Sequence, residues 1–189
     1  MKHSERLSAL TSGRTRLLSF VGAACLASGL AGFGASALAQ APSTVRIVLQ
    51  SQLRILDPVL TVAYSTRNHG YLVYDTLFSM DAKSMPQPQM VDTFTVSPDK
   101  LTYSFTLRKI KFHDGTPVTS EDVIASLKRW SSRDQMGVRL FAALQEMKAV
   151  DAQTFTIKLK EPFGLVLETL AKQSSPVPFI MPPRQCAPA

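Results

Sequence analysis

The chain has 189 residues, 45% of them apolar, with 21 lysines and arginines against 14 aspartates and glutamates. This is enough for one domain of ordinary size, and the basic residues are scattered among acidic ones, which argues against a nucleic-acid-binding protein. The sequence holds two cysteines, no Cys-x-x-Cys pair and no His-rich tract, so we expect no internal disulfide in the exported chain and no metal site.

Residues 1–39 have the pattern of a secretory signal peptide. A positively charged start is followed by an apolar stretch of small residues that ends in an Ala-x-Ala pattern at Ala39. A transmembrane anchor is the alternative, because about 20 apolar residues can span a bilayer. The abundance of Gly, Ala and Ser favours cleavage between Ala39 and Gln40. A lipoprotein is disfavoured, because Gly stands upstream of Cys25 where a large aliphatic residue is expected. Cleavage leaves 17 basic against 13 acidic residues, a net charge of +4.

The exported segment is expected to begin with a half-buried strand, because Val45, Ile47 and Leu49 alternate with polar residues. Pro58 ends this strand, since proline has no N–H to donate. The apolar side of residues 68–78 predicts a helix of about three turns. Two prolines within residues 80–91 predict a loop.

A β-hairpin is the clearest local signal in the chain. Residues 92–97 and 101–109 both alternate, and Pro98 stands in the turn between them at a position that suits its fixed φ. One face of the second strand is apolar, formed by Leu101, Tyr103, Phe105 and Leu107.

A helix is predicted to start at Thr119, which is a good N-cap with Asp122 three residues later. Its apolar stripe consists of Val123, Ile124, Leu127 and Trp130. The expected elements that follow are a polar loop over 131–138, a helix over 139–150, a strand over 151–162, a short helix over 163–172 and an extended apolar segment over 176–183. Strands and helices mix without a strict βαβ period, so the predicted class is α+β or mixed α/β.

His113 and Asp114 raise the question of a catalytic pair, and a secreted hydrolase built on them is one hypothesis for the function. Neighbouring residues in an extended stretch point to opposite faces, so the two side chains are expected to diverge. Asp114 beside Gly115 is the usual chemistry of a turn. We therefore interpret this stretch as the corner between a strand and a helix, and expect no catalytic residue.

Three stretches together resemble the family 5 extracellular solute-binding proteins, the peptide-binding, nickel-binding and related components of ABC importers. They are YDTLF (74–78), LTYSFTLRKIKFHDGTPVTSEDVIASLKRW (101–130) and TFTIKLKEPFG (154–164). The resemblance runs from about residue 45 to residue 183. Two positions depart from the family pattern, since Ile110 and Lys100 stand where glycine is usual. A lysine that must adopt a positive φ in the hairpin turn costs about 1 kcal/mol.

The resemblance implies a periplasmic, non-catalytic binding module without a cofactor, which captures a peptide or similar small solute and docks on an inner-membrane ABC permease. In the family, two lobes close over the ligand by a hinge motion. The segment Val62, Ala63 and Tyr64 would pair with a peptide backbone in the manner of an added strand. Arg67 would meet a ligand carboxylate, and Met136, in the loop 133–137, would give an adaptable apolar contact. The alternatives are a solvated arginine at position 67 and ordinary, partly buried loop residues at Tyr64 and Met136.

Length separates this chain from the family, whose members are more than twice as long. Residues 40–189 are expected to form part of the first lobe of a two-lobed, type II-like binding protein, with the second lobe absent. The ending after Pro183 departs from the family and resembles the product of a frameshift or premature stop. An alternative hypothesis is therefore a truncated fragment that binds nothing tightly and exposes apolar surface, including residues 176–182, which favours aggregation.

Overall fold

The computed structural model describes residues 44–48 and 50–186. The predicted signal peptide, with its cleavage site at Ala39 and Gln40, lies outside them. The chain divides into two units, residues 1–47 and 48–189. Of the first unit the structure describes residues 44–47, which are exposed and form neither helix nor strand. All of the described helices and strands belong to the second unit.

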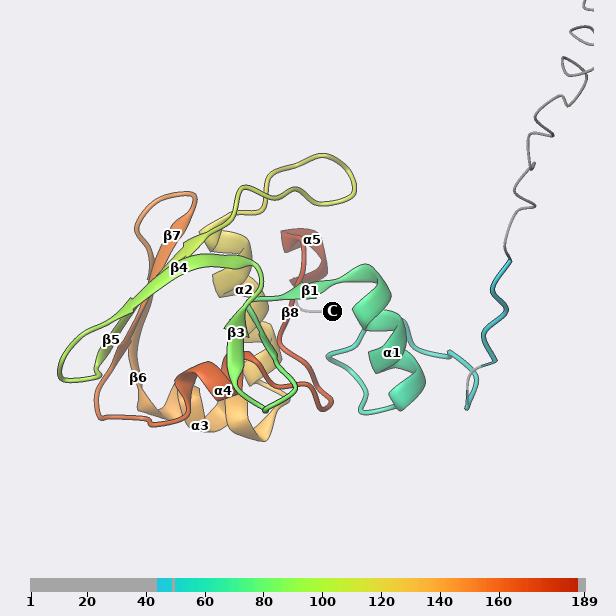
Figure 1. The fold of residues 1–189 in the computed structure, drawn as a ribbon, viewed down its shortest axis with the longest axis horizontal. Helices are drawn as coiled ribbons and strands as arrows, with labels where there is room; N and C mark the ends of the chain where they lie inside the picture. Colours follow the sequence, from blue (N-terminus) through green and yellow to red (C-terminus); the bar gives the residue numbers. More distant parts are fainter. Residues whose placement is uncertain (1–43, 49, 187–189) are drawn as a thin grey trace, which may run out of the picture. The chain divides into compact units, whose positions relative to one another are not determined.

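The second unit combines one four-stranded antiparallel sheet, two small two-stranded sheets and five helices among its described residues (Figure 1). The strand order of the main sheet is β4-β5-β7-β6, and the small sheets pair β1 with β8 and β2 with β3. The elements in chain order are α1 (Tyr64–Val73), β1 (Asp75–Thr76), β2 (Phe78–Met80), β3 (Pro86–Pro88), β4 (Val91–Val96), β5 (Thr102–Leu107), α2 (Ser120–Ser131), α3 (Gln135–Ala143), β6 (Leu144–Ala149), β7 (Thr154–Leu159), α4 (Val166–Leu170), β8 (Phe179–Ile180) and α5 (Pro183–Cys186). The mixed class predicted from the sequence is confirmed.

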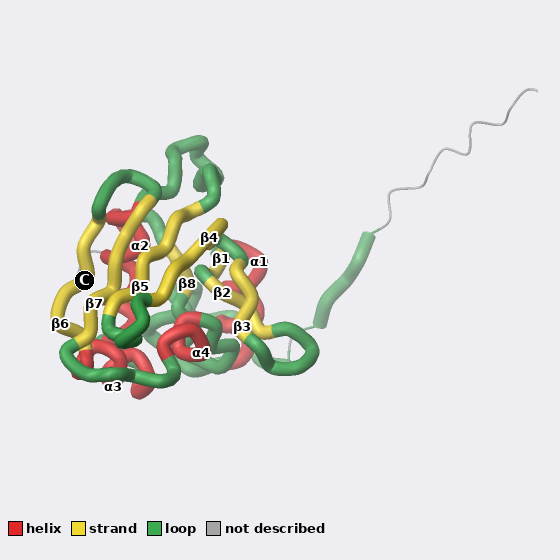
Figure 2. The backbone as a smooth tube through the Cα atoms, turned by 60° about the vertical axis from the view of Figure 1, so that its left-hand side comes forward, coloured by secondary structure: helices red, strands yellow, loops and turns green. Residues whose placement is uncertain are grey.

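The predicted hairpin forms one side of the main sheet, with β4 at the edge and β5 in the interior. β4 and β5 pair antiparallel, and Lys100 in their turn has a φ of 57°, so the expected positive φ is confirmed. Phe105 on β5 lies opposite Phe155 on β7, and their rings stack with centroids 5.0 Å apart. The apolar face of β5 and β7 packs into the core together with α2, which lies behind the sheet in Figure 2.

The helix predicted from Thr119 is α2, and its capping box is present. The Thr119 N–H donates to Asp122 Oδ2 at 2.8 Å, and the Asp122 N–H donates to Thr119 Oγ1 at 3.4 Å. Val123, Leu127 and Trp130 are fully buried on the predicted stripe. These side chains hold α2 against the sheet, since burying each of them removes a large apolar surface from water.

Two predictions near the start of the described residues are wrong. The alternating residues around Val45 and Ile47 form no strand, and these side chains are 81% and 71% exposed, because no partner strand pairs with them among the described residues. The helix predicted over 68–78 is α1, which begins at Tyr64 and ends at Val73. It ends there because Asp75 and Thr76 pair as β1 with β8, an interaction with a segment distant in the sequence.

Three later predictions also need correction. The helix predicted over 139–150 starts earlier, as α3, and gives way to β6 at Leu144, because residues 144–149 pair with β7. The loop predicted over 80–91 contains β3, which pairs with β2. The apolar segment 176–182 is not an unpaired surface, since Val177, Phe179 and Ile180 are buried and the last two form β8.

Candidate functional site

Four of the five predicted ligand residues lie at the entry to α1, within residues 62–67, which we call the α1 segment. Val62 and Tyr64 are 67% and 60% exposed, and Ala63 between them is also exposed. Arg67 lies one turn along the helix, with its guanidinium carbon 4.8 Å from the centre of the Tyr64 ring. Arg67 also donates to Asn68 Oδ1 at 3.2 Å. The segment therefore presents an aromatic ring and a cation side by side next to exposed backbone.

The backbone of this segment is available to a ligand. Ala63 is the N-cap of α1, has an extended conformation (φ −62°, ψ 131°) and donates its N–H to Thr61 Oγ1 at 3.2 Å. Within residues 44–48 and 50–186, neither the N–H nor the C=O of Val62 has a hydrogen-bond partner. An extended, exposed backbone with a free donor and acceptor can pair with a peptide main chain as an added strand does.

The first turn of α1 is fixed to the preceding segment by hydroxyl groups. Thr66 Oγ1 donates to the Ile55 carbonyl at 2.7 Å, and Ser51 Oγ donates to Ser65 Oγ at 3.2 Å. Between these two stretches lies a hollow of about 360 Å³, lined by Ser51, Gln52, Arg54, Ile55, Thr61, Ala63, Ser65 and Thr66. Of the predicted ligand residues, Ala63 lines this small hollow.

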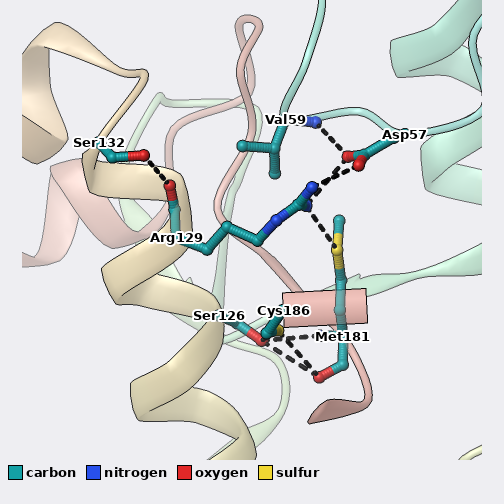
Figure 3. Close-up of polar contacts among 7 residues, drawn as sticks. All are labelled: Asp57, Val59, Ser126, Arg129, Ser132, Met181 and Cys186. Carbon is teal, nitrogen blue, oxygen red and sulfur yellow. Dashed lines mark hydrogen bonds and ion pairs between the residues drawn. The ribbon is translucent and has the colours of Figure 1, made fainter. Parts of the chain in front are cut away.

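The turn before the segment is fixed to α2 by an ion pair that sequence reasoning missed (Figure 3). Arg129 Nη1 donates to Asp57 Oδ1 at 3.0 Å, and Nη2 donates to Oδ2 of the same carboxylate. Asp57 Oδ1 also accepts from the Val59 N–H at 3.0 Å, and the Asp57 carbonyl accepts from the Leu60 N–H at 3.3 Å. The carboxylate therefore joins a tight local turn to a helix 72 residues away.

The electrostatics of the pair match its geometry. Burial raises the pKa of Asp57, but the hydrogen bonds from Arg129 and the Val59 N–H, with the charge of Arg129, outweigh it and hold this pKa below its usual value. The hydrogen bond to Asp57 raises the pKa of the Arg129 guanidinium further. Both groups are ionised at neutral pH, and bidentate guanidinium–carboxylate geometry is the strongest form of such a pair.

A small apolar core supports the same turn. Val59 is buried with Val177, Phe179 and Met181, and this cluster is separate from the main core. Ser126, one turn before Arg129 on α2, donates to the Met181 carbonyl at 3.2 Å and accepts from its N–H at 2.9 Å. One face of α2 therefore holds both the turn at residues 57–60 and the chain just after β8.

Met136, the fifth predicted residue, is half-buried in the first turn of α3 and not in a loop. Asp134 caps that helix, with its Oδ1 accepting from the N–H groups of Met136 at 2.9 Å and Gly137 at 3.0 Å. Lys172 Nζ lies 2.7 Å from Asp134 Oδ2, and the two side chains are 12% and 4% exposed. Met136 thus comes from a well-anchored helix start that is distinct from the segment at α1.

His113 and Asp114 form the expected corner. His113 is exposed, and Asp114 Oδ1 accepts from the Thr116 N–H at 3.0 Å, while Gly115 has the positive φ of 85° that such turns favour. Arg184 Nη1 lies 3.3 Å from Asp114 Oδ2 in an exposed ion pair. The Asp114 carboxylate is thus engaged in its own turn and with Arg184.

No cluster of three or more metal-binding side chains occurs among the described residues. Nor is any helix in this part of the chain long and apolar enough to cross a membrane.

Residues 85–185 match the family of bacterial extracellular solute-binding proteins, family 5 Middle. The chain belongs to this family. A probable peptide ABC transporter periplasmic-binding protein of Sinorhizobium fredii is 44% identical over 142 residues, which are 75% of this chain and 26% of that protein. A glutathione-binding protein of Salmonella choleraesuis is 32% identical over 146 residues, 76% of this chain and 28% of that protein.

Solved structures of family 5 proteins show the same fold. The PBP AgaA of A. tumefaciens R10, in complex with agropinic acid, superposes with a TM-score of 0.58 at 28% identity, over 69% of this chain and 26% of that one. The chain spans about a quarter of the length of these family 5 relatives. A match over 142 of 189 residues must include residues 48–142, so the segment at α1 belongs to the part shared with the Sinorhizobium fredii protein.

Proposed function

We propose that this protein is the substrate-binding component of an ABC importer, which captures a peptide or a similar small solute in the periplasm and delivers it to an inner-membrane permease. The observation that carries the proposal is membership of family 5, together with the 44% identical relative that is named as a probable peptide ABC transporter periplasmic-binding protein. The protein acts by binding alone, without a cofactor, after export and cleavage between Ala39 and Gln40.

The ligand is held by two kinds of contact at the α1 segment and by a third from the start of α3. The N–H and C=O of Val62 have no hydrogen-bond partner within residues 44–48 and 50–186. Next to the extended Ala63, they hydrogen-bond the main chain of a peptide, which makes this contact indifferent to the ligand's side chains. Arg67 donates to the ligand carboxylate, and Tyr64 beside it limits the directions in which the guanidinium can turn. Met136 provides an apolar contact that adapts to different side chains.

These contacts with the ligand are few, so we expect weak binding by the purified chain. A Kd of about 1 mM corresponds to about 4 kcal/mol of binding free energy, which a few backbone hydrogen bonds and one charged contact can supply. The experiment is a titration of the 15N-labelled chain with trialanine, with glutathione, and with glucose as the non-peptide comparison. Saturable shifts centred on residues 62–67, with trialanine or glutathione and not with glucose, are the expected result.

The role of Arg67 is tested by pairing a variant with a modified ligand. Arg67→Ala and amidation of the peptide's C-terminus each remove one partner of the same contact, so their effects on affinity should not add.

Two results of the titration would count against these proposals. Absence of any saturable response to peptides, at concentrations up to about ten times the expected Kd of about 1 mM, would contradict the proposed function. Saturable shifts confined to residues outside the α1 segment would contradict the residue assignment and leave the substrate class standing.

A further inference from the structure

We infer that Arg129, acting through Asp57, is a positioning residue that holds the backbone of residues 60–63 ready for a ligand. The inference rests on the proposed function for the claim that this backbone binds a ligand. The claim that Arg129 positions it rests on the hydrogen bonds and packing at its two ends. Arg129 is on α2, so it acts on residues 60–63 only through the turn at residues 57–60, which it holds by its bond to Asp57.

The segment from Leu60 to Ala63 is exposed but short, and both of its ends are fixed. At its start, Asp57 is bonded to Arg129 and to the Val59 N–H, while the Val59 side chain is buried. At its end, the first turn of α1 is bonded to the preceding chain through Thr66 Oγ1 and the Ile55 carbonyl. An exposed segment fixed on both sides has few conformations to lose when a ligand binds.

The far end of α1 is held equally firmly. A Cβ atom on Gly70 would lie 2.7 Å from the buried Phe179 ring, so the helix backbone lies directly on that ring. Tyr71 packs edge-on against Phe179 with ring centroids 4.9 Å apart. Because α1 does not depend on Arg129 for its position, loss of Arg129 frees the segment at one end only.

Arg129 is suited to this role by its surroundings. The Asp57 and Arg129 side chains are 31% and 18% exposed, so the pair is partly shielded from water and is weakened less by salt than a surface pair. The guanidinium also approaches Met181 Sδ at 3.7 Å, which limits its movement to one side. A lysine would keep the charge but not the two parallel bonds to the carboxylate.

The test compares backbone order and ligand affinity in the full chain. In Arg129→Met, 15N relaxation should show increased motion at residues 60–63 with the rest of α1 unchanged, and trialanine affinity should fall about tenfold. Arg129→Lys should give intermediate values for both quantities, since it restores the charge without the bidentate geometry. The emission of Trp130, the single tryptophan, reports whether each variant is folded.

Two controls separate positioning from general stability. Lys172→Met breaks the more deeply buried pair with Asp134 and should lower stability without changing the order of residues 60–63. Arg184→Met removes the exposed pair with Asp114 and should leave trialanine affinity unchanged. If Arg129→Met does not fold, the double variant Asp57→Asn, Arg129→Met leaves no unpaired charge and allows the same measurements.

Equal order of residues 60–63 in the wild-type and Arg129→Met proteins, with both folded, would overturn the inference. So would an unchanged trialanine affinity in a folded Arg129→Met variant. If the wild-type chain binds no peptide, the proposed function fails, but the relaxation comparison still decides whether Arg129 positions the segment.

Discussion

The close approach of α3 to the end of α2 depends on Gly137, and its replacement by alanine should destabilise the protein. A Cβ atom at this position would lie 2.7 Å from the Cα atom of Ser131 and 3.0 Å from the ring of Trp130. The first of these atoms is backbone and the ring is fully buried, so neither can move aside cheaply. Relief of the clash therefore requires α3 to shift against α2.

The size of the effect follows from two opposing contributions. Alanine is favoured over glycine within a helix by up to about 1 kcal/mol. Overpacking of a well-filled interior costs about 1–3 kcal/mol. We expect a net loss of about 1–2 kcal/mol, which for a domain of this size lowers the Tm by about 3–8 °C.

Urea denaturation followed by the fluorescence of Trp130 measures this loss directly. The denaturation midpoint should fall while the slope stays constant, because the surface exposed on unfolding is the same. Gly164→Ala is the matched control, since no atom lies within 4 Å of the point that its new Cβ atom would occupy, and its effect should stay within about 0.5 kcal/mol. A Gly137→Ala variant as stable as the wild type would refute the packing argument.

Three further predictions concern stability. The pKa of Asp57 is lowered in the folded state, so its contribution is complete above the unfolded pKa of about 3.9 and is lost as the pH falls through the folded value. The difference in urea midpoint between wild type and Asp57→Asn should therefore shrink below about pH 4, and a constant difference down to about pH 2 would contradict this linkage. Lys100→Gly should raise the free energy of unfolding by up to about 1 kcal/mol, because it removes a side chain from a residue with φ of 57°, and a lower Tm would show that the turn is not strained. Thr119→Ala should cost about 1 kcal/mol through loss of the capping box of α2, whereas Thr119→Ser should retain most of the stability in the same urea titration.

Part of the candidate site could be predicted from the sequence, but only through the resemblance to family 5. Nothing in the pattern around Val62 and Tyr64 marks a binding segment, since exposed apolar residues next to a helix start are common. The structure places Val62, Ala63, Tyr64 and Arg67 on one segment and Met136 on another. Asp57 and Arg129 were missed, because no local signal joins two residues 72 positions apart.

The sequence alone determined those features that depend on neighbours within a few residues. The hairpin of β4 and β5, the capping box at Thr119 and the turn at Gly115 were all predictable, because turn and cap chemistry is satisfied locally. The tertiary structure decided the rest. Leu144–Ala149 became β6 because β7 offered a partner, α1 ended where β8 paired with Asp75 and Thr76, and residues 44–48 stayed without regular structure because no described strand paired with them. In each case a partner strand distant in the chain, or its absence, outweighed the local preference of the residues for helix or strand. That preference amounts to about 1 kcal/mol or less per residue.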